Sequence, residues 1–120
     1  MSTESIMEIL EAGIRTENLR NKAIANNIAN LETPGYRRLD VKFEELLAKA
    51  LLSSGELDFD DVEPEFYRPE LNPVKSNGND VVLEDEVANL VKNALHYKAY
   101  IRLLNNKYKQ MNMAMNISGQ

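Results

Sequence analysis

Apolar residues along the last third of the chain recur at alternating intervals of four and three positions. The series is Leu83, Val87, Leu90, Ala94, Tyr97, Ile101, Leu104, Tyr108, Met111 and Met115, and we call it the heptad seam. Such a pattern predicts one long helix, over about 84–114, that packs lengthwise against other helices. Val91, Leu95 and Leu103 widen the stripe beyond a strict seam, which favours contact with more than one partner helix.

A second, less regular apolar stripe predicts a helix over about 5–30. Its members are Ile6, Ile9, Leu10, Gly13, Leu19, Ala23, Ile24 and Ile28. Ser5 with Glu8 three residues later has the spacing of a capping box, and we expect the helix to start there. Gly13 inside this helix costs about 1 kcal/mol relative to alanine.

The middle of the chain has a mixed pattern. A short helix is predicted over 41–52, because Phe43, Leu46, Leu47 and Ala50 share one helical face. Turn and loop residues dominate 53–80, and brief extended pieces are expected at 66–67 and 81–82. Whether these pieces form a sheet stays open at this point.

These elements predict an all-α fold, with long N- and C-terminal helices paired in coiled-coil-like fashion and joined by a largely irregular middle segment. The expected parts are 1–35, the N-terminal helix and turn; 36–80, the middle segment with its short helix; and 81–120, the C-terminal helix. They form one structural unit, since 120 residues suit a single domain. Two long helices leave much of the seam uncovered, which favours packing between molecules over the core of an ordinary helical bundle.

The net charge of −5 is local to one segment. Seven acids and one arginine lie between Gly55 and Glu70, a balance of −6 that leaves about +1 for the rest of the chain. Nucleic-acid binding, which needs a basic face, is not expected. No apolar run is long enough to span a bilayer, and the first residues do not resemble a cleaved secretory signal.

No catalytic, cofactor or metal site emerges, so we expect a protein that is not an enzyme. Cysteine is absent, and His96 is the only histidine, expected at a solvated helix position. Asp58, Asp60 and Asp61 do not complete an EF-hand loop, because Val62 and Glu63 follow where a third ligand and a glycine are required. A solvated acidic loop is the favoured interpretation over a calcium-responsive module.

The end of the first predicted helix carries an unusual motif, Ala25-Asn26-Asn27-Ile28-Ala29-Asn30-Leu31-Glu32-Thr33-Pro34-Gly35-Tyr36. Asparagine is a poor helix former, because its side chain competes for backbone hydrogen bonds. Three asparagines within five positions indicate that the amides are needed for bonds to other elements or chains. Pro34-Gly35 suits the central pair of a type II turn.

This motif resembles the signature of bacterial flagellar rod, hook and hook-associated axial proteins. The residues that match it are Ala25, Asn26, Asn27, Asn30, Thr33, Gly35 and Tyr36. The short chain and the run from Leu71 to Glu86, followed by Ala94-Leu95-His96-Tyr97, resemble members of the flagella basal body rod protein family from the proximal rod. Such members usually carry Asp, Asn or Ser at the position of Val82, so a helix cap is expected from Asp80 or Asp85 instead.

The resemblance implies a structural subunit of the proximal rod in the flagellar basal body. It implies export from the cytoplasm by the flagellar type III apparatus, without cleavage, and helical assembly that transmits torque. The implied partners are copies of the chain, other rod proteins, a FliE-type adaptor, the MS ring and the export gate. No cofactor is implied.

Candidate residues follow from the two patterns together. We expect subunit packing through Ile24, Asn27, Asn30 and Leu31, and through Leu90, Tyr97, Ile101, Leu104 and Tyr108 on the seam. The resemblance implies an export-gate element at Phe43 and Leu47, although a small amphipathic helix packed on the long ones explains both residues equally well. The alternative function is a soluble helical adaptor or chaperone that binds one partner through the seam.

Overall fold

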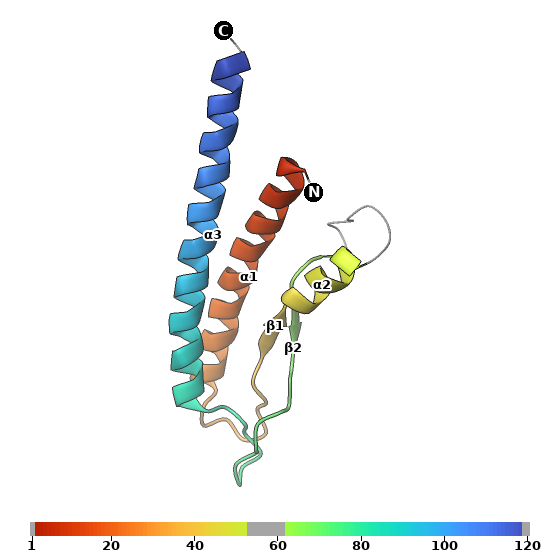
Figure 1. Ribbon diagram of the computed structural model, residues 1–120. Helices are drawn as coiled ribbons and strands as arrows, with labels where there is room; N and C mark the ends of the chain where they lie inside the picture. Colours follow the sequence, from red (N-terminus) through yellow and green to blue (C-terminus); the bar gives the residue numbers. More distant parts are fainter. Residues whose placement is uncertain (1, 53–61, 119–120) are drawn as a thin grey trace.

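The computed structural model describes residues 2–52 and 62–118. Two long helices, α1 (Thr3–Ala29) and α3 (Leu83–Ser118), run antiparallel side by side, and a smaller layer packs on α1 (Figure 1). That layer contains β1 (Asp40–Lys42), α2 (Glu44–Leu52) and β2 (Glu65–Tyr67). The molecule is elongated, with principal extents of 69 × 31 × 15 Å. The predicted pairing of long N- and C-terminal helices is confirmed, and the middle segment adds a small pair of strands.

Helix α1 begins earlier than predicted. Ser2 is the N-cap, and its hydroxyl oxygen accepts a hydrogen bond from the backbone N–H of Ser5 at 3.1 Å. The prediction of a capping box at Ser5 and Glu8 was therefore wrong by one turn. Both positions carry serine, so the sequence did not distinguish the true cap from the residue three positions later.

Helix α3 extends beyond the predicted 84–114 to Ser118. Glu84, Asp85 and Glu86 lie in its first turn, where the helix dipole favours acidic side chains. Asp80 was one of two candidates for the cap of this helix. Its carboxylate instead accepts hydrogen bonds from Arg37 and Arg38, so Asp80 belongs to a contact with the loop after α1.

The middle segment forms a two-stranded antiparallel sheet in which Val41 of β1 pairs with Phe66 of β2. The extended piece predicted at 66–67 is confirmed, whereas 81–82 is not a strand. The predicted helix over 41–52 begins only at Glu44, because Val41 belongs to β1. The acidic run 56–61 lies outside the described residues.

A small hydrophobic core fixes this layer to α1. Phe43 is buried against Ala12 of α1 and Val62, and Leu47 and Ala50 of α2 pack against the same cluster. A small element packed on a long helix, one of the two explanations given above for Phe43 and Leu47, accounts for this arrangement.

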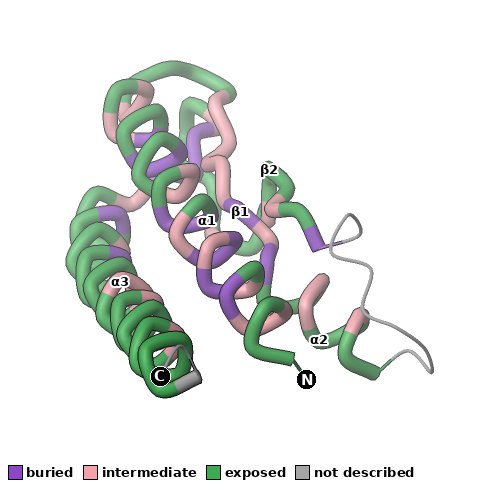
Figure 2. Tube along the Cα trace, turned by 90° about the horizontal axis from the view of Figure 1, so that it is seen from above, coloured by how far each residue is buried: buried purple, intermediate pink, exposed green. Residues whose placement is uncertain are grey.

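The face that α3 turns toward α1 is largely polar. Glu86 and Asn93 are buried there, and Tyr100 lies against Gly13 of α1, where an added Cβ would be 2.7 Å from the ring. Gly13 therefore permits the close approach of the two helices, which explains a glycine inside α1. The first half of the heptad seam is exposed, whereas Ile101, Leu104 and Met111 in its second half are partly buried. Figure 2 shows the outer surface of this helix exposed along its length.

Candidate functional site: the helix junction and the outer face of α3

Two glycine turns meet below the paired helices. Gly35 has φ +74° and the N–H of Tyr36 donates to Thr33 O at 3.3 Å, so the predicted type II turn is confirmed. Gly78 has φ +84°, and a Cβ there would lie 3.3 Å from Gly35 Cα. The N–H of Gly35 donates to Asn77 O at 2.8 Å, which joins the two turns. Both glycines are required by backbone conformation, and Gly78 also by the close approach.

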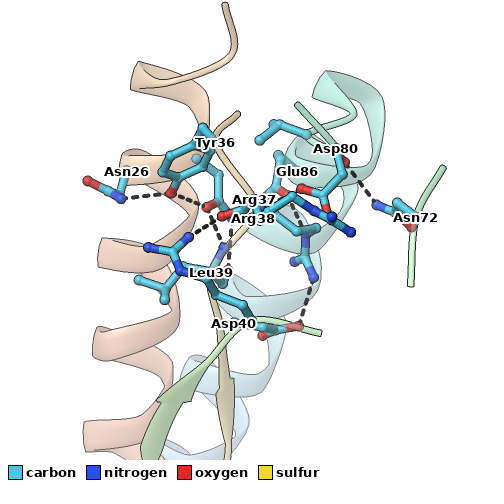
Figure 3. Close-up of polar contacts among 12 residues, drawn as sticks. Asn26, Tyr36, Arg37, Arg38, Leu39, Asp40, Asn72, Asp80 and Glu86 are labelled. Carbon is cyan, nitrogen blue, oxygen red and sulfur yellow. Dashed lines mark hydrogen bonds and ion pairs between the residues drawn. The ribbon is translucent and has the colours of Figure 1, made fainter. Parts of the chain in front are cut away.

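The end of α1, the two glycine turns and the start of α3 together form what we call the helix junction. Asn27 makes the most complete set of polar contacts in this junction. Its side chain is fully buried, and its Nδ2 donates to Leu39 O at 2.9 Å and Glu86 Oε2 at 3.1 Å. Its Oδ1 accepts from the N–H of Leu39 and from Tyr36 Oη, both at 2.8 Å (Figure 3 shows these partners). An asparagine amide has two donors and room for two acceptor bonds, so Asn27 is saturated. It connects α1, the following loop and α3.

The other asparagines of the motif close the end of α1. Asn30 Nδ2 donates to Asn26 O at 2.8 Å, and Asn26 Nδ2 donates to Tyr36 Oη at 2.7 Å. Buried Asn79 donates from Nδ2 to Asn30 O at 2.8 Å and to Thr33 O at 2.9 Å. Both carbonyl groups also accept a backbone hydrogen bond within the turn, so Asn79 adds a second bond to each and ties the turn to the segment before α3.

Two arginines neutralise buried carboxylates at the start of α3. Arg37 Nε donates to Asp80 Oδ2 at 3.1 Å, and Arg38 Nε donates to Glu86 Oε1 at 2.9 Å (Figure 3). Asp80 and Glu86 are both fully buried. Burial alone would lower the pKa of Arg38, but hydrogen bonds and ion pairs with Glu86 and Asp40 raise it above its ordinary value. These pairs hold α3 to the loop that follows α1.

A second polar cluster lies halfway along the helix pair around fully buried Glu17. Its Oε1 accepts from Arg20 Nη1 at 2.9 Å and lies 3.3 Å from His96 Nδ1. With the amide of Asn93 oriented to donate, its nitrogen reaches Glu17 Oε2 at 3.1 Å. His96 was expected at a solvated position, but this contact makes it part of the contact between α1 and α3.

Arg20 continues this cluster to the middle layer. It donates to Glu44 Oε2 at 2.5 Å and to Val41 O at 3.3 Å. The hydrogen bond from Arg20 lowers the pKa of the Glu44 carboxyl below its ordinary value, against the opposing effect of partial burial. An open polar groove of about 250 Å³ runs beside these residues, between α3 and β1. Among residues 2–52 and 62–118, no group of three or more acidic or histidine side chains is placed to hold a metal ion.

The structure divides the predicted packing residues into two groups. Ile24 and Asn27 are buried inside the chain, and Asn30 and Leu31 are partly buried. On the seam, Leu90, Tyr97 and Tyr108 are exposed by 43%, 37% and 45%, while Ile101 and Leu104 are partly buried. Contact with other subunits stays a prediction for all nine, and the exposed seam residues are free to make it.

The motif residues do not share one environment. Ala25, Asn26, Thr33 and Gly35 are exposed and Tyr36 is partly buried. Phe43 of the predicted export-gate element is only 1% exposed, and Leu47 is partly buried. Recognition through Phe43, which stays a prediction, therefore requires the middle layer to separate from α1.

Sequence reasoning missed Arg38, Asn79, Asp80 and Glu86 as partners of the motif. The run Arg37-Arg38 directly after the motif, and the acids around the start of α3, offered one signal. In a pair of antiparallel helices, the residues just after the first helix lie near the start of the second. Opposite charges at these two places are therefore expected to form ion pairs.

The sequence similarity to known proteins includes the motif at the end of α1. Residues 8–37, which include the whole motif, match the family model described as flagella basal body rod protein. None of the helices within 2–52 and 62–118 combines the length and apolar character that a bilayer crossing needs. The motif, the paired helices and this match define a flagellar basal body rod protein.

Curated relatives narrow the assignment. The chain is 30% identical to the flagellar basal body rod protein FlgB of Borrelia hermsii, over 81% of this chain and 85% of the relative. It is 28% identical to FlgB of Bacillus subtilis, over 85% and 86%. For FlgB of Aeromonas hydrophila the identity is 26%, over 89% of both chains. The chain belongs to the FlgB family of flagellar basal body rod proteins, and membership implies a structural role in the basal body.

Proposed function

We propose that this chain is a structural subunit of the proximal rod, where helical assembly with its own copies and with other rod proteins transmits torque. One observation carries the proposal. Six large apolar side chains of the heptad seam stay exposed in the folded chain, although apolar side chains at this spacing normally mark a packed helix face. They are Leu83, Val87, Leu90, Tyr97, Tyr108 and Met115. A continuous apolar face of this kind is typical of a protein–protein contact.

The polar junction suits a subunit that transmits mechanical force. Asn27, Asn79 and the two arginine–carboxylate pairs connect α1, both glycine turns and α3 through saturated, buried bonds. Such networks have well-defined geometry, because each misplaced group would remain unpaired in a low-dielectric site. The relative position of the two helices is thereby fixed, as a subunit that passes torque requires.

The location and partners follow from the same proposal. The subunit leaves the cytoplasm through the flagellar type III apparatus and assembles at the base of the rod, beside a FliE-type adaptor and the MS ring. Phe43 and Leu47 would contact the export gate before the middle layer folds onto α1. The role is structural and requires no cofactor or nucleic acid.

Deletion of the gene tests this function. We expect non-motile cells whose purified basal bodies lack the rod, and recovery of both on complementation with the wild-type gene. Intact rods in the deletion strain would overturn the proposal. A discrete cytoplasmic complex with one partner helix would then support the soluble adaptor or chaperone.

A further inference from the structure

We propose that neighbouring copies of this chain pack side by side, with the proline segment (69–73) of one copy against the seam start of the next. Leu71 is the apolar contact of the proline segment, and the seam start consists of Leu83, Val87 and Leu90. The inference rests on the rod-subunit function proposed above and names a second copy of the chain as the partner.

The proline segment presents an apolar side chain to solvent. Leu71 is exposed by 87%, and Val74, just after the segment, by 52%. A single exposed leucine is common on protein surfaces and needs no special explanation. Leu71 differs from such a residue because the backbone that carries it is held in an uncommon conformation.

The backbone directly before Leu71 is left-handed. Glu70 has φ +55°, and in the part of the chain that the structure describes it is the only residue other than glycine with a positive φ. Residues with a Cβ rarely adopt this conformation. Pro69 and Pro73 restrict the backbone on either side, because each ring fixes its own φ. Such conformations persist only where the surrounding structure holds them, and they are concentrated at binding and switch regions.

Polar contacts fix the proline segment to the residues that follow the two glycine turns. Just before it, Arg68 Nη1 donates to Arg37 O, and the Arg68 guanidinium lies 5.3 Å from the centre of the Tyr36 ring. Within it, Asn72 Nδ2 donates to Asp80 O at 3.3 Å (Figure 3). The segment is therefore ordered before a partner binds, and a preorganised side chain loses little conformational freedom on binding.

The proline segment lies on one flank of α3, and the seam start points to the other. Asn72 lines a shallow hollow of about 270 Å³ together with Asp85 and Ala88 of α3. At about 100° per residue, positions two residues apart point to nearly opposite sides of a helix. Val87 follows Asp85 by two residues. Leu90 likewise follows Ala88, so both seam residues point away from the hollow.

The two surfaces lie at the same level of the molecule. Leu83, Val87 and Leu90 are exposed by 39%, 48% and 43%, and they belong to the first turns of α3. The hollow places Asn72 beside the same turns, and Figure 1 shows the segment between β2 and α3 level with the lower end of α3. Copies set side by side without a shift along the axis therefore bring Leu71 of one copy to the seam start of the next.

One pair of charges beside the two surfaces is complementary. Lys75 lies two residues after the proline segment, and Glu84 follows Leu83 at the start of α3. Both charged side chains are exposed, and neither belongs to an ion pair formed within 2–52 and 62–118. The proposed contact brings Lys75 of one copy near Glu84 of the next, and such complementary charge favours the correct partner and register.

The contact is heterologous, because two different surfaces meet. Such a contact continues from copy to copy into a ring or an open helix and does not close as a two-fold dimer. It covers only the first turns of the heptad seam. The remaining exposed seam residues, from Tyr97 onward, stay available to other rod proteins.

Replacement of Leu71 tests the role of the proline segment. Leu71→Asp changes an exposed side chain, so the isolated variant should melt like the wild type. In competition with the wild-type chain, its incorporation into rods should fall at least about tenfold, because the contact would remove the new carboxylate from water. Leu71→Met is the matched control and should be incorporated like the wild type. Equal incorporation of the two variants would overturn the role of Leu71.

Disulfide cross-linking identifies the partner, because the chain contains no cysteine. Chains with Leu71→Cys and chains with Val87→Cys, each with a different tag, are produced together in the deletion strain. We expect disulfide-bonded dimers of the two chains in oxidised basal bodies, and monomers when only one of them is present. The control replaces Val87→Cys by Lys92→Cys, an exposed position seven residues after Asp85 and therefore on the hollow side of α3. It should give monomers.

The outcomes separate the pairing from the rod function. Monomers of the Leu71→Cys and Val87→Cys chains, in rods that contain both, would overturn the pairing and leave the rod function intact. An equal yield of dimers with Lys92→Cys would also overturn it, because a specific contact reaches only one flank of α3. Normal rods without the gene would overturn the rod function itself.

Discussion

Replacement of Asn27 by alanine should destabilise the folded chain more than any other single change in the motif. The substitution removes four hydrogen bonds at a fully buried position, one of them to the Glu86 carboxylate. A bond to a charged group contributes about 1.5–3 kcal/mol and each of the three neutral bonds about 1 kcal/mol, so the loss is roughly 4.5–6 kcal/mol. Higher helix propensity of alanine offsets up to about 0.7 kcal/mol of it.

Asn26→Ala is the matched control. It makes the same change one residue earlier on α1, at an exposed position whose side chain donates to Tyr36 Oη. The gain in helix propensity is common to both variants, so the difference between them isolates the buried contacts. We expect Asn27→Ala to unfold with a free energy at least about 3 kcal/mol lower than Asn26→Ala.

Urea titration followed by circular dichroism at 222 nm measures this difference for wild type and both variants. Equal denaturant slopes would show that stability has changed and not the extent of unfolding. A difference below about 0.5 kcal/mol between the two variants would refute the argument, because it would mean that the Asn27 amide is not held in the junction.

Three further outcomes follow from single contacts. Gly13→Ala should lower the unfolding free energy by at least about 1 kcal/mol more in the wild type than in a Tyr100→Ala background, because the new Cβ meets the tyrosine ring. Thermal melts of the wild type, both single variants and the double variant measure this difference. The pKa of Glu44 is lowered in the folded chain, so the stability that it contributes is present above the unfolded pKa near 4.5 and is lost as pH falls through the folded value. The difference in unfolding free energy between wild type and Glu44→Gln should therefore shrink on acidification. A constant difference would exclude the ion pair with Arg20 as its cause. Asn79→Ala should increase amide hydrogen exchange at the end of α1, whereas Asn72→Ala, at a partly buried site with one bond, should leave it unchanged.

Local patterns predicted the helices and the turn. The heptad spacing placed α3, and the Pro34-Gly35 pair placed the turn after α1, because both depend on residues close in sequence. The start of α1 was misplaced because Ser2 and Ser5 are equally good caps. The strand pair was not predicted as a sheet, since each strand has only three residues and its partner lies beyond α2.

The orientation of α3 about its own axis was beyond the sequence pattern. Apolar spacing identifies the seam but not which molecule covers it, and the structure turns a polar face toward α1 instead. That face is stabilised by partners far apart in sequence, such as Asn27 with Glu86 and Glu17 with His96. Buried charges of this kind are unfavourable unless their partners are present, and spacing within one helix does not reveal those partners.

The heptad seam as an intersubunit contact is the central claim, and one double substitution tests it directly. Leu90→Asp with Tyr97→Asp changes two seam residues that are exposed in the folded chain. The isolated chain should keep its helicity and melting profile, yet the variant should be absent from basal bodies purified from a complemented deletion strain. Ala99→Asp, exposed on another side of α3, is the control and should be incorporated. Incorporation of the double variant at the wild-type level would contradict the account.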